Sequence, residues 1–397
     1  MSLLKFRASL GRTGNAELGG NFNYVQLIEP TAGYQGVQGQ APSQLANPDL
    51  TWENNTSYDL AFDYGLFDGR LSGTAAYYNK RGTNILLNQS VQISATGFAR
   101  LPANSSVVIE NQGWEFELTS RNISSSKLTW TTSLNLSANY NKVISAGGIP
   151  PDGFDSGGPG DARVIEGFPV GTNYLAEYAG VNPETGNSRI RALNGTLIDL
   201  TNTTPATAIT DNRVPTGRPF PKVQGGLNNT VTYAGFDLDV LFVGSYGNKV
   251  YDDGGKYQNG GRIGSWNQTA RLLDRWQQPG QDALFARPTL RPFNPDQNNT
   301  TQWLYDGSYL RLRNLAFGYT IPQSITRKAH ISRLRLYVTG SNLLLFTKYP
   351  GWDPEVVRYA DAGSATGRNN GGNLAFTAPY LPTPQARTFS AGFTLGF

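Results

Sequence analysis

The chain has 397 residues, which exceeds one typical soluble domain but which a single large barrel could absorb. Charged residues make up 16% of it, well below the roughly 25% of soluble domains, while glycine and aromatic residues are abundant. The net charge of +4 is small and the basic residues are scattered, so nucleic-acid binding has little support. Because the chain has no cysteine, disulfides and thiolate metal sites are excluded.

Neither a membrane-spanning helix nor a signal peptide is predicted. No apolar run approaches the ~18 residues that such a helix needs. The first residues, Met1 to Leu10, lack the charged start and apolar block of a secretory signal. They alternate in character instead, and predict a strand.

Ten segments alternate between apolar and polar residues with the period of two that a two-faced strand requires. Most reach or exceed the roughly 9–11 residues that cross a bilayer when tilted. In chain order they are residues 3–10, 51–64, 70–80, 108–123, 128–140, 222–233, 236–250, 308–321, 331–346 and 389–397.

The last of these segments shows the alternation most plainly. Phe389, Phe393 and Leu395 fall on one face, and small or polar residues fall on the other. The segment 308–321 breaks the rule, because its leucines change parity near Asn314. A β-bulge at that point would restore a single apolar face.

The connections between these segments also alternate, between tight turns and long loops. Four are short, including those at Asp68-Gly69 and Ala234-Gly235. The other five are long and rich in glycine, asparagine and proline: residues 11–50, 81–107, 141–221, 251–307 and 347–388. Two-faced strands with short turns at one end and long loops at the other are typical of an outer-membrane barrel.

The predicted fold class is therefore all-β: an antiparallel transmembrane β-barrel portion, about ten strands of a larger barrel. In hydrocarbon a sheet must satisfy every backbone group internally, and lipid accepts an uncovered apolar face. A watery lumen would accept Asp237, Asp239, Arg333 and Arg335. The alternative is a soluble sandwich or β-helix, in which the same apolar residues would form a core.

Nothing in the sequence predicts an enzyme or a resident cofactor. The single histidine, His330, falls in a short turn at the end opposite the long loops, away from any outward-facing nucleophile. The loop acids Asp252-Asp253 and those from Asp152 to Asp161 could hold Ca²⁺, but they lack the spacing of a calcium loop. We interpret them as solvated acids.

Loop aromatic residues are the candidate substrate contacts, because flat rings stack on sugars or clamp peptide side chains. The alternative is that these rings pack the loops onto one another. We expect at least one ring to face a substrate cavity. The candidates are Trp266, Trp276, Trp303 and Tyr257, with Trp352 as a further loop ring.

Several short motifs, in this order along nearly the whole chain, resemble the barrel half of SusC/RagA-type TonB-dependent transporters. They are Leu4–Asn15, Asn47–Glu53, Gly69–Leu71 with Tyr77–Lys80, Asn111–Glu115, Asp306–Asn314, Gly340–Leu343 and the terminal Phe397.

This resemblance implies a barrel of about 22 strands with an N-terminal plug, in the outer membrane of Bacteroidota-type bacteria. It also implies nutrient uptake of oligosaccharides or peptides, a SusD-like lipoprotein as a lid, and energy from the TonB–ExbB–ExbD motor. On this interpretation residues 1–397 are the C-terminal part of the barrel, and we expect plug, TonB box and signal peptide to be absent from them. Outer-membrane lipid would be the partner of the apolar face.

Two other functions remain open from the sequence. A passive porin-like channel would conduct without any motor. A surface adhesin would use its loops to bind a partner, and loop deletion would abolish attachment while leaving nutrient uptake intact.

Overall fold

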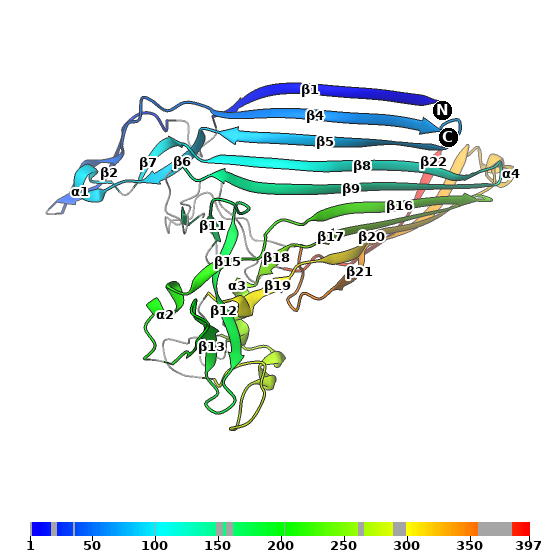
Figure 1. Ribbon diagram of the computed structural model, residues 1–397. Coiled ribbons are helices and arrows are strands. Elements are labelled where there is room, and N and C mark those ends of the chain that lie inside the picture. The colour runs from blue at the N-terminus through cyan, green and yellow to red at the C-terminus, as the bar shows by residue number, and fades with distance from the viewer. Residues whose placement is uncertain are drawn as a thin grey trace.

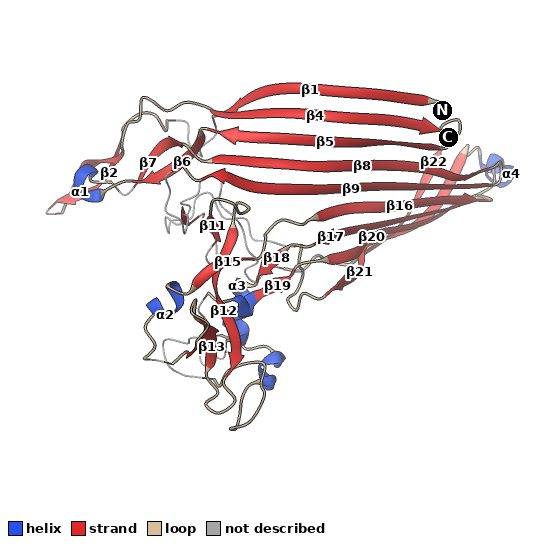
Figure 2. Ribbon diagram, viewed as in Figure 1, coloured by secondary structure: helices blue, strands red, loops and turns tan. Residues whose placement is uncertain are grey.

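The dominant feature of the protein is one large antiparallel sheet, from whose one end the long loops extend (Figure 1). The computed structural model describes residues 2–16, 22–34, 36–98, 100–147, 154–155, 162–201, 203–260, 266–288, 299–355 and 383–397. Strands dominate this part of the chain, and its helices are short (Figure 2). None of these helices is long and apolar enough to cross a bilayer.

The sheet contains the ten strands that the sequence predicts, each hydrogen-bonded to its neighbour in chain order. Strand β1 and strand β22 form its two edges, and no pairing joins them among the described residues. The strands are β1 (Leu3–Asn15), β4 (Glu53–Leu66), β5 (Leu71–Thr83), β8 (Val108–Ser124), β9 (Leu128–Ser145), β16 (Val223–Tyr233), β17 (Phe236–Tyr246), β20 (Tyr309–Thr320), β21 (Arg333–Thr347) and β22 (Thr388–Gly396).

One face of this sheet, which we call the apolar face, carries large hydrophobic side chains that nothing in the described chain covers. Phe6 is 76% exposed and Phe393 is 65% exposed. Leu136 is exposed, and Leu134 and Leu238 are only half-buried. The alternative of a soluble sandwich is therefore wrong, because it requires these side chains to lie beneath a second layer.

The bulge predicted near Asn314 is confirmed, and the residue left out of the pairing is Arg313. On β17, the adjacent residues Phe242 and Leu241 pair with Leu312 and Asn314, so Arg313 is an extra residue relative to that strand. One extra residue on β20 returns the strand to the same parity after the shift. The leucines on both sides of Arg313 therefore share the apolar face.

The tight turns lie at the end of the sheet opposite the long loops. The two-residue turn between β16 and β17 has Ala234 at φ 50° and Gly235 at φ 90°, the backbone of a type I′ hairpin. The turn between β20 and β21 contains α4 (Gln323–Thr326) and η4 (Arg327–Ala329), and ends at His330 with φ 60°. The predicted position of this histidine, away from the loops, is confirmed.

The long loops are more ordered than the sequence analysis predicts, because they form small sheets and helices of their own. Strands of two to ten residues with irregular alternation give little sequence signal. The loop elements are β2 (Leu27–Tyr34), β3 (Val37–Gln44), β6 (Ile85–Ser90), β7 (Arg100–Ser105), β10 (Phe154–Asp155), β11 (Ala162–Val164), β12 (Thr172–Val181), β13 (Ser188–Arg191), β14 (Leu197–Asp199), β15 (Arg213–Thr216), β18 (Lys249–Tyr251), β19 (Leu304–Asp306), α1 (Ile93–Thr96), α2 (Thr207–Thr210), α3 (Asp253–Asn259), η1 (Ala270–Asp274) and η3 (Thr301–Trp303).

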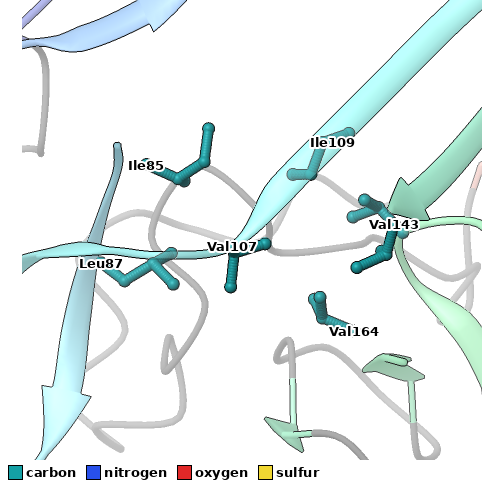
Figure 3. Close-up of a cluster of buried hydrophobic side chains, with 7 residues drawn as sticks. Ile85, Leu87, Val107, Ile109, Val143 and Val164 are labelled. Atoms are coloured by element: carbon teal, nitrogen blue, oxygen red, sulfur yellow. The ribbon is translucent and has the colours of Figure 1, made fainter. Parts of the chain in front are cut away.

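The buried hydrophobic clusters of the protein lie in and beneath these loops. Figure 3 shows the first cluster, where Ile85, Val107 and Val143 pack together at the loop end of the sheet and Val164 joins them from β11. A second cluster forms around the fully buried Trp303. The loops are thus a body with its own core, built on the end of the sheet.

Candidate functional site: the loop pocket

Side-chain hydrogen bonds link residues across the other face of the sheet, which we call the polar face. The Arg7 guanidinium donates to both carboxylate oxygens of Asp63, at 2.8 and 2.7 Å. Farther along the sheet, Arg335 Nε donates to Asp237 at 2.9 Å. The hydroxyl of Thr230 donates to Asp239 at 2.9 Å. The first and last of these contacts join neighbouring strands, and the Arg335–Asp237 contact reaches across β20.

Above this polar face the loops enclose a pocket of about 220 Å³, which we call the loop pocket. Helix α3, the start of η1 and the segment after β21 form its walls. Its lining combines two carboxamides, a carboxylate, a guanidinium and two rings, a set that can both hydrogen-bond and stack. The lining residues are Asp252, Gly254, Gly255, Gln258, Asn259, Thr269, Arg271, Tyr349, Pro350, Gly351 and Trp352.

Asp252 holds the floor of the loop pocket. It caps α3 by accepting a hydrogen bond from the backbone N–H of Gly255 at 2.8 Å. Its carboxyl is buried, and burial raises its pKa, while the Arg271 guanidinium and the Tyr349 hydroxyl act in the opposite direction. Burial also raises the pKa of Tyr349, so that its hydroxyl stays protonated and available as a donor.

The rim of the loop pocket carries Trp352, whose side chain is 67% exposed. The preceding residue must be glycine, because a Cβ on Gly351 would lie 2.5 Å from the ring of Tyr349. The chain therefore folds tightly around Tyr349 and presents the indole of Trp352 outward. An exposed ring beside polar groups is a surface suited to a ligand with both apolar and hydrogen-bonding parts.

A cluster of charged and polar side chains with a buried ion pair at its centre connects the pocket wall to the sheet. We call this cluster the latch: Arg311, Arg313, Asp353, Glu355 and Gln385. Arg311 donates to Asp353 at 2.6 Å, and both side chains are about 3% exposed. Arg313 donates to Gln385 at 2.6 Å and also contacts Glu355. Arg311 Nε lies 3.1 Å from Glu355, close enough for ionic attraction although not aligned for a hydrogen bond.

The bulge of β20 makes the latch possible. Arg311 lies on the polar face, and Arg313 is the extra residue at the bulge. Arg311 reaches Asp353 and Glu355, and Arg313 also reaches Glu355. Asp353 and Glu355 come directly after Trp352. The latch therefore positions the rim of the loop pocket relative to the sheet.

The four aromatic candidates from the sequence fall into two groups. Trp303 is fully buried among Leu175 and other apolar side chains, and Trp276 lies against Gly186 with its indole N–H donating to the Pro183 carbonyl at 2.7 Å. Both pack loops together. The rings of Tyr257 and Trp266 contact each other at a tilt of 42°, with centroids 5.6 Å apart, and Trp266 is 39% exposed. As substrate contacts all four stay predictions.

The loop acids considered for Ca²⁺ are engaged elsewhere where the structure describes them. Asp252 caps α3, and Asp253 forms a buried ion pair with Lys256 at 2.5 Å. No group of three or more possible ligands occurs among the described residues. The acids from Asp152 to Asp161 lie almost wholly outside the described residues.

Residues 2–343 match the family described as "TonB dependent receptor-like, beta-barrel". The chain belongs to this family. It is 32% identical to TonB-dependent receptor P3 of Formosa agariphila over 99% of its own length, and 24% identical to TonB-dependent receptor SusC of Bacteroides thetaiotaomicron. It spans about two fifths of the length of these relatives, 39% and 38% respectively.

Solved structures of the RagAB peptide transporter match the fold with a TM-score of 0.77, at 24% identity. That match covers 99% of this chain and 41% of the other. The SusC/RagA resemblance is thereby confirmed at the level of family and fold. The barrels of this family lie in the bacterial outer membrane, so the apolar face meets lipid and the polar face lines the lumen.

Proposed function

We propose that the protein serves TonB-dependent nutrient import across the outer membrane, with this chain supplying the C-terminal part of the barrel wall and the roof of a substrate cavity. The observation that supports the proposal is the latch, which connects the barrel wall to the loops above it. The latch fixes the loop pocket to the polar face, so a ligand held by the loops would sit over the lumen.

The substrate class that fits the loop pocket is an oligosaccharide or a peptide. Trp352 supplies an exposed ring, and Gln258 brings a carboxamide to the pocket wall. Both ligand classes present an apolar surface beside many hydrogen-bonding groups. The neighbour RagAB is titled a peptide transporter, which supports the peptide arm of this proposal.

The proposed partners follow from the same family. A SusD-like lipoprotein would close over the loops after capture, and the TonB–ExbB–ExbD motor would act on a plug carried by the longer protein. Capture by the loops and release toward the lumen would then be separate steps. In this scheme the chain described here binds and guides the ligand, and the motor supplies the energy.

The proposal is tested by uptake into cells that express the intact protein. Fluorescent oligosaccharides and fluorescent peptides are offered separately, in cells with and without a functional TonB. We expect one of the two classes to enter, and its entry to stop without TonB. Entry that continues at the same rate without TonB would point to a passive channel, and attachment without entry would point to an adhesin.

A matched pair of tryptophan variants tests the loop pocket itself. We expect Trp352→Ala to weaken ligand binding about tenfold or more, because removing a central aromatic anchor has an effect of that size. Trp52→Ala removes a ring of the same exposure, 66% against 67%, from a different loop. This control should leave binding unchanged. Equal effects of the two variants would contradict the assignment.

A further inference from the structure

A groove of about 800 Å³ lies on the apolar face, near the loop end of β16 and β17. Its floor is formed by Gly225 and Gly244, which pair directly with each other on neighbouring strands. Leu136 and Leu310 continue the same row on either side. Because two adjacent positions carry no side chain, the wall is recessed there by the depth of a side chain.

The walls of the groove come from the rows above and below the two glycines. Toward the middle of the strands, Leu227 pairs with Phe242. Toward the loops, Val223 pairs with Tyr246, whose side chain is 65% exposed. Phe346 closes the side on β21. The result is an apolar hollow, bounded along the strands by these two pairs, with room for part of an acyl chain.

The loop end of the groove carries positive charge. Lys348 is exposed and lines the groove two residues beyond Phe346. Lys249 is close by, and both lysines act on the carboxylate of Asp306, which also accepts a hydrogen bond from the Ser308 backbone N–H at 2.9 Å. Two ammonium groups against one carboxylate leave a net positive charge at the rim.

We propose that this groove is a specific site for a phosphorylated, acylated lipid of the outer leaflet. One acyl chain would lie over Gly225 and Gly244, and a phosphate of the headgroup would meet Lys348. The order of features along the strands fits such a lipid: cation at the loop end, aromatic walls next, then aliphatic side chains toward the bilayer centre. The proposal rests on the placement of the sheet in the membrane and is independent of transport.

A second hollow on the apolar face provides an internal comparison. It measures about 590 Å³ and is lined by apolar residues that include Ala75 and Trp114. The cation among its lining residues is Arg7, whose guanidinium is paired with Asp63 on the polar face. This hollow offers acyl contacts without a free cation, so it should accept lipid without preferring one headgroup.

The test is lipid retention by the intact protein, purified in detergent and titrated with defined lipids under native mass spectrometry. The probes are bisphosphorylated lipid A and zwitterionic phosphatidylethanolamine. We expect lipid A to be retained in preference, and Lys348→Gln to reduce that preference roughly fivefold, the effect of about one lysine at a charged lipid surface. Gly244→Leu should reduce retention by filling the groove.

Gly244 is a better position than Gly225 for filling the groove, since an added Cβ would lie 3.2 Å from the nearest atom, against 2.2 Å at Gly225.

The matched controls are Lys127→Gln, which changes an exposed lysine in the β8–β9 turn, and Ala75→Leu in the second hollow. Both should leave the preference unchanged, and heat-dependent gel mobility verifies that each variant is folded. Equal retention of the two lipids by the unmodified protein would overturn the proposal. So would an unchanged preference in Lys348→Gln.

Discussion

The sheet and the loop body treat the same residue types in opposite ways. In the sheet, Phe6 and Phe393 are 76% and 65% exposed, whereas in the loops Leu175 and Trp303 are fully buried. Burial in the loops is supplied by the protein, and burial of the apolar face is supplied by lipid. One chain is therefore folded in two environments, with lipid against the sheet and a protein core in the loops. The latch connects these two regions.

The largest effect is expected where the two regions meet. Asp353→Asn removes the buried carboxylate to which Arg311 donates and leaves it only the ionic attraction of Glu355, a loss of up to ~3–5 kcal/mol. We expect the segment carrying Tyr349 and Trp352 to detach, while the sheet stays folded. Hydrogen exchange should show lost protection in residues 347–355 and unchanged protection in β20.

The control for this variant is an exposed ion pair in the loops. Arg191 and Glu177 lie 3.0 Å apart with side chains about half exposed. Exposed pairs of this kind contribute ~0–1 kcal/mol, so Arg191→Gln should leave exchange nearly unchanged. If the two variants behaved alike, the latch would have no special role in positioning the loop pocket.

The next largest effect is a difference in stability between charges placed on the two faces of β17. Val240→Arg places a charge on the apolar face of β17, and we expect a loss of ~2–4 kcal/mol in unfolding free energy, measured by urea titration in lipid vesicles. Leu241→Arg, one residue along, places the same charge on the polar face, where the loss should be much smaller. Equal losses would contradict the assignment of the faces.

A smaller effect concerns glycines that lie directly opposite a tyrosine. Gly392 pairs with Tyr337, and a Cβ on the glycine would lie 2.6 Å from the tyrosine hydroxyl oxygen. The ring therefore covers the bare backbone of the edge strand, a contact worth up to about 1 kcal/mol. We expect Tyr337→Ala to show this loss in urea titration and Tyr337→Phe to show little of it.

The smallest effect is a pH dependence confined to the loop pocket. Because burial raises the pKa of Asp252, the folded loops bind its proton more tightly than the unfolded chain does. Loop stability should therefore fall as pH rises from the ordinary value of 3.8 through the raised pKa. Thermal unfolding followed by tryptophan fluorescence should show this slope, and Asp252→Asn should remove it. An identical pH dependence in Asp252→Asn would contradict the claim that burial raises the pKa of Asp252.

Much of the sheet could be predicted because its signal is local. Alternation with period two identifies each strand, and the change of parity near Asn314 identifies the bulge. Predicted boundaries are less accurate. The segment predicted over residues 236–250 ends as a strand at Tyr246, and Lys249–Tyr251 forms a separate short strand. That ending depends on where the loop leaves the sheet, which alternation does not encode.

The loop pocket was predictable only in part, because its contacts join residues far apart in sequence. Trp352 was named as a loop ring by residue type and lines the pocket, whereas Tyr257 and Trp266 contact each other and are not among the lining residues. The latch was missed, since Arg311 and Asp353 are 42 residues apart and no motif links them. An arginine at the bulge and a second one two residues before it are the signal that could have indicated the latch.

The central claim, that the apolar face meets lipid, is tested most directly with neighbouring positions on β21. Residues 1–397 contain no cysteine, so a single cysteine at Val338 or at Thr339 is the one labelling site in this part of the protein, and any cysteine outside it is first replaced by serine. The intact protein is then placed in vesicles of lipids with brominated acyl chains, which quench fluorophores that they touch. The account predicts strong quenching at position 338 and little at 339, and equal or reversed quenching would contradict it.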